Sequence, residues 1–184
     1  MKSRILATIL LITISFSCNH KKLNHKFTVV AADSIVENID KYRETKVETE
    51  GAIIHVCRVN GKKMKLKTEN GEIIKVVPKD SLDSFNTSFL KKRIKVYGLV
   101  KESHIEKPYI DKMEKERTLL CHIDHTPCKD SSWVARQESA GTTDSLSKQG
   151  ILKLKRKMEQ TQKSYVSVIT IIAEKYEVVD KSAN

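Results

Sequence analysis

The distribution of hydrophobic and polar residues predicts short β-strands in the first half of the chain. Residues 47–59 (VETEGAIIHVCRV) form a long run rich in β-branched residues, and residues 62–68 alternate between apolar and basic positions. Residues 72–77 (EIIKVV) form a third run. Asn60-Gly61 and Asn70-Gly71 separate the runs, and Asn-Gly is a strong hairpin signal. The pattern therefore predicts an antiparallel meander of three strands.

Later segments supply what a closed barrel needs. A short helix or turn is expected over residues 80–90, and residues 93–100 (RIKVYGLV) predict a fourth strand. Residues 164–179 are rich in Val, Ile, Thr and Tyr, which favour a closing fifth strand. This order is typical of the OB-fold, and Gly51 suits a bulge that lets the first strand pair at both edges. The predicted fold is mainly β with added helices, built on a five-stranded OB-like barrel.

A long insertion, residues 103–163, separates the fourth and fifth predicted strands. Residues 107–120 and 151–162 have apolar residues at helical spacing. Residues 130–148 are polar and without periodicity, so no regular element is expected there. Between them lies the stretch CHIDHTPCKD, residues 121–130, which holds two of the four cysteines and two of the six histidines.

The N-terminus has the features of a secretory signal. Lys2 and Arg4 precede an apolar run over residues 5–16, which is too short to span a bilayer because a span takes about 20 residues. The small residues before Cys18 resemble a bacterial lipoprotein signal, in which the cysteine is lipidated, although Ser15 stands where leucine is usual. An ordinary signal peptide cut nearby, or an uncleaved anchor, is the alternative.

The predicted organisation has four parts. They are a lipoprotein signal peptide (1–17), a tether with a short helix within 31–42 (18–45), the OB-like domain (46–179) and a tail (180–184). The expected location is the bacterial cell envelope, where the lipid on Cys18 would hold the chain to a membrane, facing the periplasm.

The composition is basic, which suggests an anionic partner. The net charge is +11, and it falls to +9 when the predicted signal peptide is removed with Lys2 and Arg4. Lipid headgroups, acidic glycans and nucleic acid are all candidates. Binding of single strands also needs aromatic platforms, and the first three predicted strands contain no Phe, Tyr or Trp. We therefore interpret Lys63, Lys65 and Lys67 as a solvated outer face, and nucleic acid is not the expected partner.

Catalysis has little support in the sequence. There is no phosphate-binding glycine loop, no Gly-x-Ser-x-Gly elbow and no His-Glu-x-x-His motif. Asp80 and Asp83 are most simply helix-capping and turn residues. A protein that is not an enzyme is therefore the expectation.

Several motifs resemble a known family. The segments that carry the likeness contain His55-Val56-Cys57, Gly61-Lys62-Lys63 and Val96-Tyr97-Gly98, together with the final SYVSVITIIAEKYEVV. They are similar to a family of uncharacterised bacterial envelope proteins with an OB-like domain, and the likeness covers most of residues 46–179. The resemblance implies the fold and says nothing settled about activity.

Two chemistries compete for the Cys/His stretch. If Cys18 is lipidated, three thiols remain, and an oxidising compartment favours a Cys121–Cys128 disulfide with Cys57 as a small buried hydrophobe. Thiolate and imidazole are also the ligands that zinc prefers, although the spacing matches no standard zinc motif. We predict a metal site, with zinc as the expected ion, at Cys121, His125 and Cys128, completed by His122, His55 or Cys57.

The combined prediction is a lipid-anchored, non-enzymatic OB-fold binding module that binds, or is stabilised by, a transition metal such as zinc. The alternative is an OB-fold scaffold that binds an envelope protein or glycan, or single-stranded nucleic acid.

Overall fold

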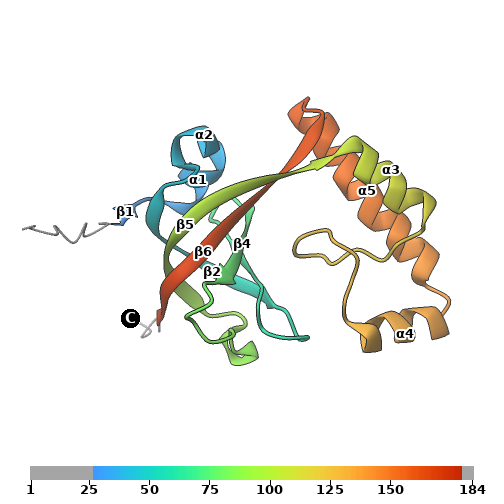
Figure 1. Cartoon of the computed structure of the whole chain (residues 1–184), viewed down its shortest axis with the longest axis horizontal. Helices are drawn as coiled ribbons and strands as arrows, with labels where there is room; N and C mark the ends of the chain where they lie inside the picture. Colours follow the sequence, from blue (N-terminus) through green and yellow to red (C-terminus); the bar gives the residue numbers. More distant parts are fainter. Residues whose placement is uncertain (1–26, 180–184) are drawn as a thin grey trace, which may run out of the picture.

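The computed structural model describes residues 27–179, and its centre is a closed five-stranded β-barrel (Figure 1). The barrel strands are β2 (Lys46–Val56), β3 (Met64–Lys67), β4 (Ile73–Pro78), β5 (Arg93–Glu106) and β6 (Tyr165–Val179). Both Asn-Gly pairs lie in the turns between strands, as predicted, and Gly61 and Gly71 adopt positive φ values, 61° and 91°, which glycine tolerates readily. The signal peptide and Cys18 lie outside the described residues.

The strand order is that of an OB-fold. Neighbours run β2-β3-β4-β6-β5, and β5 pairs with β2 to close the barrel. All pairs are antiparallel except β4 with β6, which are parallel. The predicted OB-like barrel, with an insertion between its fourth and fifth strands, is therefore confirmed.

Strand β2 serves both edges of the barrel, as the sequence predicted. Residues 46–52 pair with β5 and residues 52–56 pair with β3. Gly51 lies at the change of partner, where a Cβ atom would stand 2.7 Å from the Leu66 side chain. The register shift in β2 falls between Ile53 and His55. Gly51 is therefore needed for close packing, and the irregularity lies nearer the end of the strand.

Alternating side chains of the five strands fill the barrel, and the N-terminal segment closes one end. Helices α1 (Ala32–Glu37) and α2 (Ile39–Tyr42) contribute Ile35 and Ile39 to the same core. Burial of each such side chain stabilises the fold by roughly 1.5–3 kcal/mol. Part of the predicted tether is thus in the fold, since β1 (Thr28–Val29) pairs in parallel with β2 and Val30 is buried.

The insertion is carried on an arm that extends from the barrel. Strands β5 and β6 stay paired as far as Glu106 and Tyr165, and the arm leads to the insertion helices (Figure 1). These helices are α3 (Lys107–Lys115), α4 (Ser131–Ser139) and α5 (Thr143–Thr161). A second core holds them to the arm, made of Ile105, Ile110, Met113, Ile151, Leu154 and Val166.

The prediction that residues 130–148 contain no regular element was wrong. This segment contains α4 and the start of α5. Helix α4 begins where the Asp130 carboxylate accepts a hydrogen bond from the Trp133 backbone N–H at 2.9 Å, and it has no fully buried residue. It therefore lacks the apolar stripe that reveals a helix in a sequence.

Residues 80–90 form turns and a short 3₁₀ helix, η1 (Thr87–Phe89). No helix within residues 27–179 is long and apolar enough to cross a membrane.

Candidate functional site

The Cys/His stretch folds as a small hairpin, residues 119–128, which we call the Cys/His hairpin. Leu120 and Pro127 form a bridge, and the Cys121 N–H donates to the Thr126 carbonyl at 2.7 Å. The Cys128 N–H donates to the Leu119 carbonyl at 2.8 Å. The tip closes where the His125 N–H donates to the Cys121 carbonyl at 2.8 Å. This register places Cys121 and Cys128 at diagonal positions on one face of the hairpin.

The hairpin docks against the barrel, toward which it projects from the insertion (Figure 1). Lys63 of the β2–β3 turn forms an ion pair with Asp124, with Nζ and Oδ2 2.5 Å apart. The rings of His55 and His122 meet edge to face, with centroids 4.1 Å apart. The Ile123 side chain is buried. The docking therefore joins the end of β2 to a hairpin more than 60 residues later in the chain.

A pocket of about 400 Å³ lies between the end of β2, the Cys/His hairpin and α4. We call it the thiol pocket, because all three cysteines of the described chain line it. These thiols are free and half-buried. Five of the six predicted metal ligands line this one pocket: His55, Cys57, Cys121, His122 and Cys128.

His125, the sixth predicted ligand, lies elsewhere. It lines a separate cavity of about 210 Å³ on the other side of the hairpin, where four lysines gather. Its carbonyl accepts a hydrogen bond from the Tyr109 hydroxyl at 2.9 Å, which fixes the hairpin to α3. The structure therefore does not bring His125 together with the thiols around the pocket.

The electrostatics of the hairpin keep its imidazoles neutral. Burial lowers the pKa of His122 to about 4, helped by the nearby His55 and Lys65. Burial also lowers the pKa of His125 to about 4, with Lys65 adding to the effect. At neutral pH both rings are therefore uncharged, which is the form that binds metals. Burial raises the pKa of the Cys121 thiol, so this sulfur is protonated unless a cation draws the proton off.

Asp124 stays ionised in spite of its burial. Burial alone would raise its pKa, but hydrogen bonds from Lys63 and Thr126 outweigh that effect and hold the pKa at about 2. The hairpin therefore presents a fixed negative charge to Lys63, and this ion pair holds the hairpin on the barrel.

The sequence did not identify the remaining walls of the thiol pocket. Trp133 and Arg136 come from α4, and Arg58 and Asn60 come from the β2–β3 turn. The only local signal was Asp130, whose capping role places Trp133 in the first turn of α4 beside the hairpin. Trp133 is thus half-buried at the pocket rather than in a polar loop.

The prediction of a solvated lysine face was also wrong in part. Lys67 is exposed, but Lys63 is paired with Asp124 and Lys65 is half-buried in the lysine-lined cavity. The reason is the insertion, whose hairpin and α5 face the outer side of β3 and β4 across that cavity. That face is where OB-folds bind oligonucleotides and oligosaccharides.

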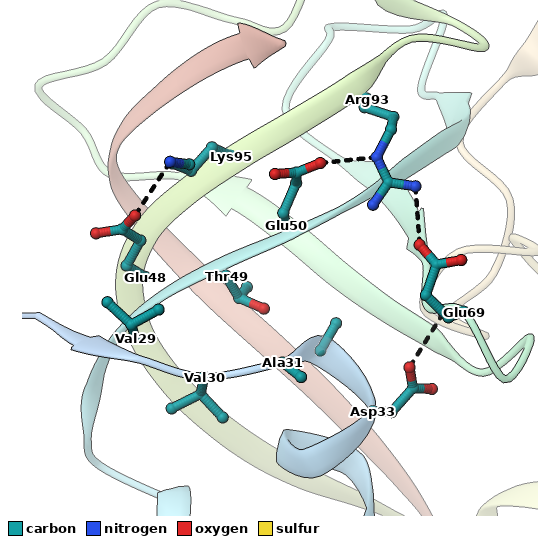
Figure 2. A pocket seen from close by; sticks show the side chains of 11 residues that line it. Val29, Val30, Ala31, Asp33, Glu48, Thr49, Glu50, Glu69, Arg93 and Lys95 are labelled. Carbon is teal, nitrogen blue, oxygen red and sulfur yellow. Dashed lines mark hydrogen bonds and ion pairs between the residues drawn. The ribbon is translucent and has the colours of Figure 1, made fainter. Parts of the chain in front are cut away.

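Another cavity, of about 370 Å³, lies where the N-terminal segment meets β2 and β5 (Figure 2). Both cations that line it are already paired with carboxylates. Arg93 bridges Glu50 at 2.7 Å and Glu69 at 2.8 Å, and Lys95 pairs with Glu48 at 3.3 Å. Asp33 accepts hydrogen bonds from the Glu69 and Asn70 backbone N–H groups. The hydrogen bonds of Asp33 fasten α1 to the barrel. Together with the ion pairs, they give this cavity a structural explanation.

No protein-family model matches the chain, and no curated protein matches it either. Among residues 27–179, no three His, Cys, Asp or Glu side chains already stand in an arrangement that would hold a metal ion. The functional argument therefore rests on the thiol pocket and on the side chains that could converge there.

Proposed function

We propose that this chain is a lipid-anchored, non-enzymatic binding module of the bacterial envelope, and that its thiol pocket binds a transition metal such as zinc. One observation carries the metal proposal: all three cysteines of the described chain line one pocket with two histidines. They come from two segments more than 60 residues apart. Thiolate and imidazole together are the ligand set that zinc prefers.

The proposed ligands are Cys57, Cys121 and Cys128, with His55 as the fourth. His55 and Cys57 are two residues apart at the end of β2, and both line the pocket. Cys121 and His122 are adjacent, so they seldom reach one ion together, which favours His55 over His122. Because residues 27–179 contain no ready-made cluster, metal binding there requires these side chains to rotate toward one another.

The thiol chemistry supports a metal over a disulfide. Diagonal neighbours across a hairpin are roughly 7–8 Å apart, whereas a disulfide needs Cα atoms about 4.4–6.8 Å apart. A Cys121–Cys128 disulfide would therefore require the two segments of the hairpin to move closer together. A bound ion would also protect three thiols in an oxidising compartment, where free thiols are otherwise rare.

The rest of the proposal follows from the sequence and the covered face of the barrel. The envelope location and the lipid rest on the pattern before Cys18 and on the family resemblance. Nucleic acid is not favoured, because β2, β3 and β4 carry no Phe, Tyr or Trp on which bases could stack. The hairpin and α5 of the insertion also stand across a cavity from the face of β3 and β4 that oligonucleotide-binding OB-folds leave open.

Cobalt substitution tests the metal site directly. Cobalt(II) bound by thiolates in a tetrahedral site gives intense absorption that depends on the number of sulfur ligands. We expect the reduced full chain to bind one equivalent of cobalt with thiolate absorption, and zinc to displace it. Cys57→Ser and Cys128→Ser should each weaken binding by at least about tenfold, because each removes one ligand.

Cys18→Ser is the matched control, since Cys18 lies outside the described residues and is not a proposed ligand, and this variant should leave the cobalt spectrum unchanged. Absorption without a thiolate band, or equal loss in Cys18→Ser, would contradict the metal site. In that case the alternative of a scaffold for an envelope protein or glycan would be the better explanation.

A further inference from the structure

We propose that the cavity on the other side of the Cys/His hairpin is an anion site that binds a phosphate or sulfate group. This lysine pocket has a volume of about 210 Å³. Four lysines from three elements line it: Lys65 of β3, Lys75 of β4, and Lys153 and Lys157 of α5. The inference is independent of the metal proposal, because the two pockets have different walls apart from His122 and Ile123 of the hairpin.

The lysines are placed as two like-charged pairs. Lys65 and Lys75 stand directly opposite each other in the register of β3 and β4, an arrangement that destabilises an antiparallel pair. Lys153 and Lys157 are four residues apart on α5, so their charges also repel on one face of the helix. The fold brings both unfavourable pairs to one cavity.

Nothing in the described part of the chain neutralises this charge fully. The residues that line the pocket include no Asp or Glu. Lys157 has Glu72 at 3.5 Å, and Asp124 on the hairpin is engaged by Lys63. Within residues 27–179, Lys65, Lys75 and Lys153 take part in no ion pair.

The pKa values of the two lysines on the strands, Lys65 and Lys75, are lowered in this arrangement. Burial lowers the pKa of Lys65, and the nearby Lys153 lowers it further. Burial likewise lowers the pKa of Lys75 and outweighs the opposite effect of the Asp124 charge. A fold that keeps two half-buried ammonium groups, Lys65 and Lys75, side by side without an ion-pair partner among residues 27–179 gives up stability, which is typical of sites that bind a ligand.

The chemistry of the walls indicates the ligand. Lysine ammonium groups bind phosphate as point charges, and a doubly charged tetrahedral oxyanion can meet several of them at once. The lining also has two histidines, Ser167 and apolar side chains such as Ile73, Leu154 and Ile169, and the apolar side chains lower the local dielectric constant around the charges. The small volume fits a single phosphate, a sulfate or a diphosphate rather than a polymer.

Calorimetry on the purified full chain, kept in chelator so that no metal is bound, tests the proposal. We expect inorganic pyrophosphate to bind saturably with one site per chain and to raise the melting temperature. Lys65→Met and Lys75→Met should each weaken binding by about tenfold or more, because each removes a charged hydrogen-bond donor. Both variants should fold, since they remove repulsion, and their melting temperatures without ligand should equal or exceed that of the parent.

Lys67→Met is the matched control, because Lys67 lies on the same strand but is exposed and lines neither pocket. Vesicles containing phosphatidic acid provide a second arm. Binding of pyrophosphate would identify a free anion as the ligand. Binding of vesicles with the same dependence on Lys65 and Lys75 would identify a lipid headgroup. Either result supports a phosphate site. Absence of binding in both arms, or equal weakening in Lys67→Met, overturns it.

Discussion

At the scale of single residues, a few contacts determine how the insertion meets the barrel. The Lys63–Asp124 ion pair is largely shielded from water, with 26% of the Lys63 side chain and 10% of the Asp124 side chain exposed. It joins the β2–β3 turn to the Cys/His hairpin. Lys63 lines the thiol pocket, and Asp124 lies between the pocket-lining residues Ile123 and His125 of the hairpin. This pair therefore helps to set the shape of both sites.

Replacement of Lys63 by methionine should lower the free energy of unfolding by roughly 1–3 kcal/mol, the usual contribution of a hydrogen bond to a charged group. The reason is that Asp124 would keep its buried charge without a partner. Urea denaturation at neutral pH measures the change, with Lys67→Met as the control that should change stability by no more than about 0.5 kcal/mol. Equal stability of the two variants would show that the hairpin is held in another way.

Replacement of two glycines by alanine should change the stability of the protein in opposite directions. A Cβ atom at Gly98 would stand 2.3 Å from the Ile172 carbonyl oxygen, at the bulge between β5 and β6, whereas nothing lies within 4 Å of one at Gly150. Gly98→Ala should therefore cost about 1–3 kcal/mol or more through overpacking. Gly150→Ala, inside α5, should instead stabilise the protein by roughly 0.5–1 kcal/mol. Thermal unfolding of both variants checks the two signs together.

At the scale of elements, the β5–β6 arm joins the barrel to the insertion. Glu102 lies on this arm with only 2% of its side chain exposed. Its carboxylate accepts a hydrogen bond from the Ser167 hydroxyl at 2.6 Å and forms an ion pair with Arg43 at 2.6 Å. Burial would raise the pKa of Glu102, but Ser167, Arg43 and His104 outweigh burial and lower it.

The lowered pKa predicts how stability depends on pH. A carboxyl group with a lowered pKa in the folded state stabilises the protein above its unfolded pKa of 4.5, and this contribution is lost as the pH falls through the folded value. Glu102→Gln should therefore be less stable than the parent at pH 7, by about 1–3 kcal/mol, and the difference should shrink below about pH 4.5. Denaturation across this range tests it, with the exposed Glu106→Gln as a control that should show little change. A difference independent of pH would contradict the assignment.

The elements also show what the sequence could and could not predict. The strands were predictable because alternating residues and Asn-Gly turns are local signals, and the barrel order followed from them. Helix α4 was missed because its contacts leave no buried stripe. The two pockets were not predictable, because the contact of His55 with His122 and the docking of α5 beside Lys65 join distant segments. The sequence did identify the thiols, yet it could not place His125 in a different cavity.

At the scale of the whole molecule, the barrel, arm and insertion form a platform whose two pockets flank one hairpin. The positive charge of the chain gathers in part around that hairpin, rather than forming only a solvated outer surface. On our proposal, a lipid at Cys18 would hold this platform near a membrane.

Replacement of Cys18 by serine tests the anchor. The variant should appear in the soluble fraction and lose labelling by fatty acid, because the proposed lipid is attached to that sulfur. Fractionation with radiolabelled palmitate measures both. If Cys18→Ser stayed as membrane-bound and as strongly labelled as the parent, the lipoprotein interpretation would be wrong, whatever the thiol pocket binds.

The most direct test of the central claim is to count bound metal and free thiols in one sample of protein folded in the envelope. We predict one zinc per chain, and three thiols that react only after unfolding in chelator: Cys57, Cys121 and Cys128. The contradicting result is no bound metal, one reactive thiol after unfolding without reductant, and a peptide that joins Cys121 to Cys128.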